Sequence, residues 1–190
     1  MKIIGVIMTY NCESLVQKAI DQIPKEEFDK LICTDDGSTD NTIEIVKKNN
    51  IEFIKNNHLG YGMNLYAGMK KAFDLGATHV IELHGDSQYD FTYVKEMKQN
   101  FSQGCDLVLG NRFFNFKEPL VNGMPIYIYL GNIFLTILGK IGLGIKNDDL
   151  FQGFRGYSKN LFNKINTNNY NKDYRFSYEI IAQSYYLDLK

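Results

Sequence analysis

The stretch THVIELHGDSQYD, Thr78 to Asp90, passes from apolar to polar within one short segment. Val80, Ile81 and Leu83 suit a buried strand. A polar cluster follows directly and consists of His84, Asp86, Gln88 and Asp90. In open α/β sheets, ligands bind beyond the carboxyl ends of the strands. The stretch therefore predicts a core strand that delivers polar side chains to one edge of a sheet.

Apolar runs and helical patterns alternate along the chain up to Asn111. Strands are expected at 2–10, 29–35, 51–56, 79–83 and 105–111, and helices at 13–23, 38–50, 61–77 and 90–101. This alternation is typical of βα units around a mainly parallel sheet. Pro24 and Gly76 end two of the helices, and Ser38 or Asp40 caps another. The sequence therefore predicts an α/β fold.

The alternation fails after Asn111. Residues 112–125 have the composition of a loop, 124–144 an apolar helix, 150–158 a short strand, 166–171 a polar loop and 175–190 a final helix. No internal repeat or low-complexity linker separates these elements, so we expect one domain over residues 1–190.

Composition argues against several classes of protein. Twenty-one basic and 22 acidic residues give a formal charge of −1, so nucleic acid is not an expected partner. Three cysteines without CxxC spacing indicate neither a disulfide framework nor a zinc site, and a reducing cytoplasm fits them best. The apolar N-terminal run is too short for a signal peptide.

The longest apolar region extends from Met124 to Lys146 and is interrupted by Asn132, Lys140 and four glycines. A membrane-spanning helix needs about 20 predominantly apolar residues, and this region falls short of that. A helix at a membrane surface, or one packed on the sheet or on a partner chain, is favoured over a spanning helix.

Polar residues and glycines follow the other expected strands. Asp35 and Asp36 can accept hydrogen bonds from a nucleobase or a ribose; the alternative is a pair of acids favoured by a helix N-terminus. Gly60 and Gly62 precede a helix, where they either leave N–H groups free for an anion or simply form a turn. The remaining strand-end residues are Thr9, Tyr10, Asn11, Asn111 and Arg112.

His84, Asp86 and Gln88 are spaced two apart. If the chain stays extended there, the three side chains share one side and can hold a divalent ion that neutralises a diphosphate. The alternative is a polar turn in which His84 is hydrogen-bonded to the backbone.

The motifs VIMTYN, TDDGSTDNT, HLGYGMNLYAG, HGDSQYD, GNRF and FQGFRGYS occur in this order. Their order and spacing resemble the inverting glycosyltransferases of family 2, in particular the group of dolichol-phosphate mannose synthases and other polyprenol-phosphate glycosyltransferases. The resemblance implies a GT-A fold, a UDP- or GDP-sugar as donor, and Mg²⁺ or Mn²⁺ as cofactor. It also implies a nucleotide-sugar-binding half at 1–112 and an acceptor half at 113–190. More sequence normally follows the last helix in that family, so we expect a chain shortened at its C-terminus.

The resemblance also assigns roles to residues. It implies a nucleotide pocket formed by Thr9, Tyr10, Asn11, Asp35, Asp36, Gly60 and Gly62, with Asp86 and Gln88 as ligands of the metal and the diphosphate. His84 stands where the family usually has an aspartate. A neutral imidazole there favours Mn²⁺ relative to Mg²⁺, or else His84 orients Asp86 without binding the metal.

On the acceptor side, GNRF resembles the family motif GSRF and places Arg112 near the acceptor or the diphosphate; a surface salt bridge is the alternative. DDLFQGFRGYS resembles DxxSGFR and matches Asp149 and Arg155, while Tyr178 and Glu179 resemble an aromatic-acid pair near the active-site floor. The expected catalytic residues are therefore Asp86, Arg112 and Arg155.

The family's ED motif, which supplies a general base for hydroxyl acceptors, is missing. A polyprenyl phosphate is already ionised and needs no base, so a lipid phosphate is the expected acceptor. Two alternatives stay open: a transferase acting on a glycan hydroxyl, and a nucleotide-sugar-binding module without turnover. The expected location is the cytoplasm, with peripheral contact to the cytoplasmic face of the membrane.

Overall fold

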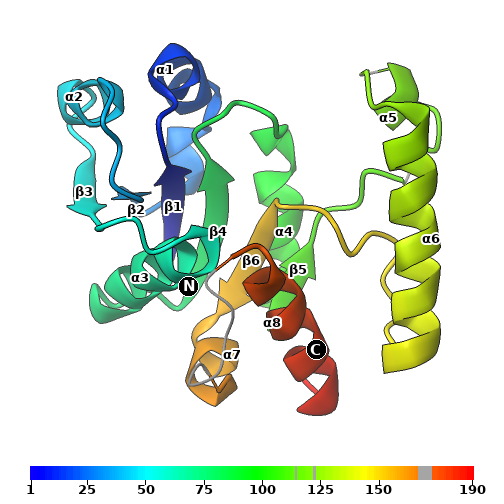
Figure 1. Cartoon of the computed structure of the whole chain (residues 1–190). Helices are drawn as coiled ribbons and strands as arrows, with labels where there is room; N and C mark the ends of the chain where they lie inside the picture. Colours follow the sequence, from blue (N-terminus) through cyan, green and yellow to red (C-terminus); the bar gives the residue numbers. More distant parts are fainter. Residues whose placement is uncertain (114, 122, 167–172) are drawn as a thin grey trace.

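A computed structural model describes residues 1–113, 115–121, 123–166 and 173–190. Within these ranges one six-stranded sheet has the order β3-β2-β1-β4-β6-β5 (Figure 1). The first four strands in this order are parallel, whereas β6 runs antiparallel to both β4 and β5. The strands are β1 (Ile3–Thr9), β2 (Lys30–Asp35), β3 (Glu52–Lys55), β4 (His79–His84), β5 (Leu107–Leu109) and β6 (Arg155–Ser158). The predicted α/β fold in one domain is confirmed.

Helices cover both faces of the sheet. Side chains of α1 (Glu13–Gln22), α2 (Thr42–Lys48) and α4 (Val94–Ser102) share one apolar cluster with Ile7 and Leu83. Side chains of α3 (Tyr61–Asp74), α7 (Lys159–Lys164) and α8 (Arg175–Tyr186) share another with Val6 and Val80. Neighbouring residues of β1 thus face opposite layers, as the two-residue period of a strand requires. Two short 3₁₀ turns, η1 (Lys25–Glu27) and η2 (Phe91–Tyr93), complete these layers.

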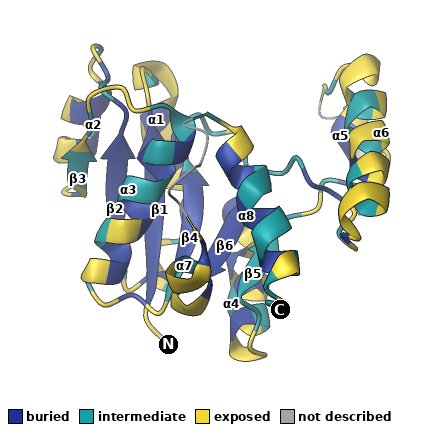
Figure 2. Ribbon diagram, turned by 60° about the horizontal axis from the view of Figure 1, so that its bottom comes forward, coloured by how far each residue is buried: buried dark blue, intermediate teal, exposed yellow. Residues whose placement is uncertain are grey.

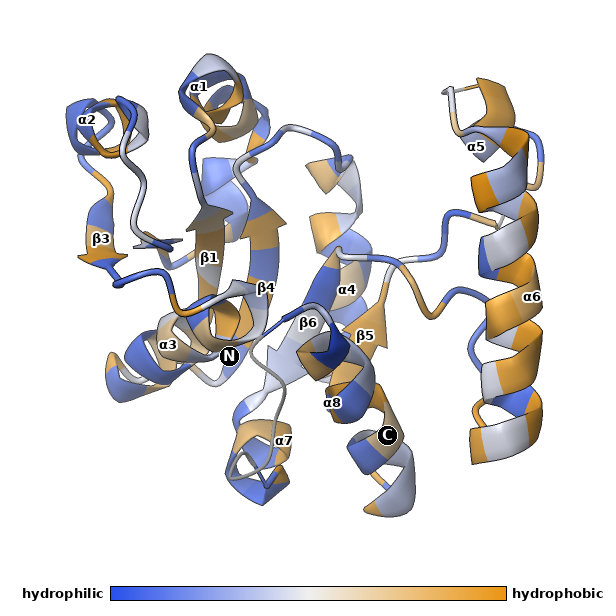
Figure 3. Cartoon of the chain, in the orientation of Figure 1, coloured by the Kyte–Doolittle hydropathy of each residue, from blue (hydrophilic) through white to orange (hydrophobic). Residues whose placement is uncertain are grey.

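The apolar helix α6 (Ile126–Leu143) stands apart from the sheet (Figure 1). Thr136 is its only buried residue among those described, and its surface is largely exposed and apolar (Figures 2 and 3). Within the described residues, α6 is long enough and apolar enough to cross a membrane, judged by length and composition only. The alternative in which this segment packs on the sheet is wrong.

Three local predictions needed correction. Helix α2 begins at Thr42 rather than at residue 38, because Asp40 accepts a hydrogen bond from the Thr42 N–H at 3.0 Å. The expected loop after Arg112 contains the short helix α5 (Glu118–Val121). Helix α7 was not expected; the Ser158 hydroxyl caps it by accepting from the Leu161 N–H at 3.0 Å. The predicted loop 166–171 lies outside the described residues except for Asn166.

Gly62 lets the start of α3 approach α8 closely. A Cβ atom at this position would lie 2.8 Å from the Asp173 carbonyl oxygen and would overlap the Phe176 side chain. We expect Gly62→Ala to lower the free energy of unfolding by about 1–3 kcal/mol, because neither backbone can yield without disturbing the packing. Urea denaturation would measure the change.

Gly131→Ala in α6 is the matched control. No atom lies within 4 Å of a Cβ built at Gly131, and alanine is favoured over glycine in a helix by about 1 kcal/mol. Equal stability losses in the two variants would contradict the packing role of Gly62.

Candidate functional site

A pocket of about 340 Å³ opens at the carboxyl ends of β1, β2 and β4. Parallel strands end at the same edge of a sheet, so residues distant in sequence meet there. The predicted site residues in its wall are Thr9, Tyr10, Asp36, Gly60, His84 and Asp86. The structure brings these residues together, and their individual roles remain predictions.

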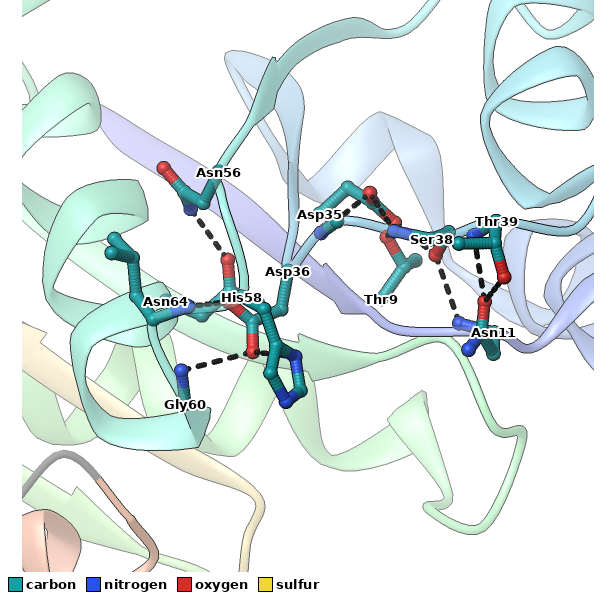
Figure 4. Close-up of polar contacts among 12 residues, drawn as sticks. Thr9, Asn11, Asp35, Asp36, Ser38, Thr39, Asn56, His58, Gly60 and Asn64 are labelled. Carbon is teal, nitrogen blue, oxygen red and sulfur yellow. Dashed lines mark hydrogen bonds and ion pairs between the residues drawn. The ribbon is translucent and has the colours of Figure 1, made fainter.

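Asp35 is fully buried within its own turn (Figure 4). Its carboxylate accepts hydrogen bonds from the Gly37 and Ser38 N–H groups at 3.1 and 2.8 Å. It also accepts from the hydroxyls of Ser38 at 2.5 Å and Thr9 at 2.9 Å. Four donors use the capacity of both oxygens, so no lone pair is left for a nucleoside. In this geometry Asp35 shapes the turn rather than contacting a ligand.

Asn11 belongs to the same turn. Its amide oxygen accepts from the Thr39 N–H at 2.8 Å, and its own N–H donates to the Ser38 hydroxyl at 2.8 Å (Figure 4). These bonds tie the loop after β1 to the loop after β2. Asn11 is not part of the pocket wall.

Asp36 lies in the pocket wall and holds the loop before α3. Its carboxylate accepts from the N–H groups of Leu59 at 2.6 Å and Gly60 at 3.0 Å (Figure 4). The Gly60 N–H is therefore not free for an anion, although the φ of +87° at Gly60 still requires glycine for the turn. His58 lies 3.4 Å from the Asp36 carboxylate, and its ring is 4.9 Å from that of Tyr10. The two rings form an aromatic rim beside Asp36.

The segment after β4 does not stay extended. The strand ends at His84, and Ser87 adopts a left-handed φ of 57°. Asp86 accepts from the Gln88 N–H at 3.2 Å and shares the pocket with His84, whereas Gln88 is not in the pocket wall. No cluster of three His, Cys, Asp or Glu side chains suited to a metal occurs among the described residues. One carboxylate and one imidazole fit a cation that takes its other ligands from phosphate and water.

Glu82 was missed by the sequence analysis. Its carboxylate is completely buried and accepts hydrogen bonds from Tyr61 at 2.5 Å, Tyr157 at 2.6 Å and the His84 Nε2 atom at 2.8 Å. Burial raises the pKa of Glu82, but the hydrogen bond from His84 and the nearby positive charges bring the pKa below its usual value. Burial and the Glu82 charge raise the pKa values of both tyrosines, so their hydroxyls stay protonated donors. The signal was a lone acid inside an apolar strand.

Arg155 lies beneath this cluster and is only 3% exposed. Its Nε donates to the Gln152 carbonyl at 2.6 Å and its Nη2 to the Leu150 carbonyl at 3.3 Å. Its Nη1 is buried without a hydrogen-bond partner in the described part of the chain. Burial lowers the pKa of Arg155, but the nearby Tyr157 and the Glu82 charge raise it above its usual value. Arg155 was expected among the catalytic residues; it lines neither pocket, and its role remains a prediction.

Arg112 forms a bidentate ion pair with the buried Asp149. The Nε and Nη2 atoms of Arg112 lie 2.8 and 2.9 Å from the carboxylate, and the Arg112 backbone N–H donates at 3.1 Å. Burial lowers the pKa of the Arg112 guanidinium, but the hydrogen bonds and charge of Asp149 raise it overall. The alternative of a surface salt bridge does not hold, because the Asp149 side chain is fully buried. Arg112 is thereby fixed in the wall of a second pocket.

This second pocket has a volume of about 400 Å³ and adjoins the first. Tyr89 connects them, because it lines the second pocket and its ring lies 4.6 Å from that of His84. Burial raises the pKa of Tyr89 to about 12, so its hydroxyl stays neutral. Apolar walls come from Met97, Val108, Leu109, Pro119 and Phe154. Glu179 is half-buried and lines neither pocket.

Comparison with known proteins agrees with this geometry. Residues 6–166 match the family described as "Glycosyl transferase family 2". The chain is 31% identical over 173 residues to the UDP-N-acetylglucosamine–dolichyl-phosphate N-acetylglucosaminyltransferase of Methanococcus voltae, covering 81% of this chain and 68% of that protein. It is 27% identical over 165 residues to a dolichyl-phosphate hexose transferase of Haloferax volcanii, covering 85% of this chain and 69% of that protein.

Among solved structures, the chain resembles glucosyl-3-phosphoglycerate synthase from Mycobacterium tuberculosis, a complex with Mn²⁺, UDP and glucosyl-3-phosphoglycerate. The TM-score is 0.61 at 17% identity, over 84% of this chain and 57% of that one. The present chain thus spans little more than half of that solved chain, and the likeness concerns the GT-A fold. With a family match that covers most of its length, the protein belongs to glycosyltransferase family 2.

Proposed function

We propose that this protein transfers a sugar, with inversion at the anomeric carbon, from a nucleotide-diphosphate sugar to a polyprenyl phosphate. The observation that carries the proposal is the adjacency of the two pockets. The first offers Asp86 and an aromatic rim, and the second combines the fixed Arg112 with apolar walls. Relatives named for dolichyl phosphate support a lipid phosphate as the acceptor class.

The donor would bind in the first pocket as a UDP- or GDP-sugar. The aromatic rim of Tyr10 and His58 offers a stacking surface for the nucleobase. Gly60 and Asp36 define the wall next to it. UDP in the complex of the mycobacterial synthase supports a uridine nucleotide.

A divalent ion, Mg²⁺ or Mn²⁺, would be held by Asp86 and His84, whereas Gln88, which we expected as a further ligand, lies outside the pocket wall. When bound, such an ion neutralises the charge that develops on the departing diphosphate. The Mn²⁺ in the mycobacterial complex supports this cofactor class. A single protein carboxylate suffices, because the diphosphate itself supplies further oxygen ligands.

In the proposed reaction, an oxygen of the acceptor phosphate forms a bond to the anomeric carbon. The bond from that carbon to the diphosphate breaks, and its electron pair leaves with the nucleoside diphosphate. Arg112, held by Asp149, orients the acceptor phosphate through the donors that face the second pocket. Arg155, which we expected to contact the acceptor, would act from beneath by balancing the charge of Glu82.

A hydroxyl acceptor would need a general base, and the two acids of the DDLFQGFRGYS motif, Asp148 and Asp149, are both in ion pairs. Asp149 is bound to Arg112, and the exposed Asp148 pairs with Lys140 at 2.6 Å. Asp149 also accepts from the Arg112 and Phe151 N–H groups at 3.1 and 3.0 Å, so both of its oxygens are occupied. This supports a phosphate acceptor, which needs no base, over the glycan-hydroxyl alternative.

Asp86→Asn should lower kcat for sugar transfer by at least about 10²-fold, because a carboxylate that holds the cation near the leaving diphosphate is lost. Transfer from UDP- or GDP-sugars to a short polyprenyl phosphate, with Mn²⁺ and with Mg²⁺, would measure it. Asp74→Asn is the control: Asp74 pairs with Lys70 at 2.8 Å on the exposed surface and lines neither pocket. Equal losses in both variants would count against the role of Asp86.

Arg112→Lys should raise the KM for the lipid phosphate about tenfold or more and leave the KM for the donor nearly unchanged, since lysine cannot reproduce the two-pronged pairing. Steady-state kinetics with each substrate varied in turn would show the split. Arg175→Lys is a matched control, because Arg175 makes a similar pair with Asp173 on the exposed surface. A rise in the donor KM alone would contradict the acceptor role.

The exposed apolar surface of α6 should bring the protein to a membrane surface beside its lipid acceptor. In liposome flotation, the purified chain should rise with vesicles that contain anionic lipid. Ile141→Glu, at a position that is 77% exposed, should reduce the floating fraction without unfolding the chain. Full retention of the unmodified chain in the soluble fraction would refute the membrane contact.

A further inference from the structure

We propose that Glu82 is a positioning residue: its buried carboxylate accepts a hydrogen bond from the Nε2–H of His84 and so presents the Nδ1 lone pair of His84 to the pocket as a metal ligand. The inference deepens the proposed function and rests on it for the identity of the ligand. It requires three things of the structure: a fixed proton on Nε2, a fixed ring, and an accessible Nδ1.

The position of the proton follows from the partner. An ionised carboxylate can only accept hydrogen bonds, so the His84 Nε2 atom, 2.8 Å from Glu82, must carry the hydrogen. Glu82 is completely buried, and its other contacts are hydroxyl donors from Tyr61 and Tyr157. Three donors from three different elements are thus directed at the two oxygens of Glu82, which leaves the carboxylate the acceptor at each contact.

Packing fixes the plane of the His84 ring. The ring of Tyr89 lies 4.6 Å from it and the ring of Tyr61 lies 6.0 Å from it. Gly153 closes the Nε2 side: a Cβ built at Gly153 would approach Nε2 to 3.2 Å and overlap the Tyr89 hydroxyl. The imidazole is therefore confined between neighbours, and the hydrogen bond to Glu82 selects which of its edges faces inward.

The opposite nitrogen remains available. Within the described residues Nδ1 of His84 has no hydrogen-bond partner, and it is not among the buried atoms that lack one. His84 lines the first pocket beside Asp86. A neutral imidazole whose other nitrogen donates to a carboxylate is a more basic and better oriented metal ligand. This arrangement compensates for the missing carboxylate at position 84 and favours Mn²⁺ over Mg²⁺.

The first experiment determines which ring nitrogen of His84 carries the proton in the unmodified protein. The chain contains three histidines, so ¹⁵N NMR of the histidine-labelled protein at alkaline pH and without ligands can resolve each ring, with His84→Gln identifying the His84 signal by its loss. We expect His84 in the form protonated at Nε2. A ring protonated at Nδ1, or one that exchanges between both forms, would overturn the proposal whether or not the protein is a transferase.

The second experiment measures Mn²⁺ binding in the presence of UDP by electron paramagnetic resonance. Glu82→Gln should shift His84 toward the form protonated at Nδ1, because a side-chain amide can donate to Nε2, and should weaken Mn²⁺ binding about 10–100-fold. Tyr157→Phe is the control, since it removes a different donor to Glu82 and leaves the pair with His84 intact. Unchanged Mn²⁺ affinity in a folded Glu82→Gln protein, or equal loss in Tyr157→Phe, would overturn the proposal.

Failure of the positioning role of Glu82 can be distinguished from failure of the proposed function. If the unmodified protein shows the Nε2-protonated ring but binds no Mn²⁺ with any UDP- or GDP-sugar, the ligand role of His84 falls together with the proposed function. If Mn²⁺ and donor bind but the ring has the other form, only the positioning role of Glu82 falls.

Discussion

A completely buried carboxylate, that of Glu82, sets the strictest constraint on this structure. An uncompensated charge in a protein interior costs several kcal/mol, so the surroundings of Glu82 must supply donors and opposite charge. They come from three elements: Tyr61 at the start of α3, Tyr157 on β6 and His84 at the end of β4. The antiparallel strand β6 is thereby fixed against the parallel part of the sheet at the point where the first pocket opens.

The loops after β2 and before α3 are held by two carboxylates that accept hydrogen bonds from backbone N–H groups. Asp35 and Asp36 are adjacent in sequence, yet each satisfies backbone donors of a separate loop. Asp35 closes its own turn, and Asp36 holds the loop that leads into α3. Because these polar groups are already satisfied by the protein, a ligand meets a preformed wall and little ordering is needed when it binds.

The strands and the large helices followed from local sequence patterns, as β1 illustrates with its continuous apolar run. Contacts between distant residues did not. Glu82 looked like a single polar interruption of a strand, and its partners Tyr61 and Tyr157 lie 21 and 75 residues away in the chain. The burial of Arg155 was hidden for the same reason, since a motif records residue types and not depth. The cluster of strand-end residues was predictable because parallel topology fixes where strands end.

The spatial order of the site explains why α6 can stay exposed. Tyr89 connects the first pocket with the second, and Arg112 lies in the wall of the second. Beyond Arg112, the ring of Phe113 lies 5.6 Å from that of Tyr129, and Lys140 pairs with Asp148, so α6 is anchored to the segments on either side of the Arg112–Asp149 pair. An acceptor whose phosphate is at Arg112 would extend its apolar chain toward this helix. The exposed apolar residues of α6 then have a physical reason: they would face the same lipid phase from which the acceptor chain comes.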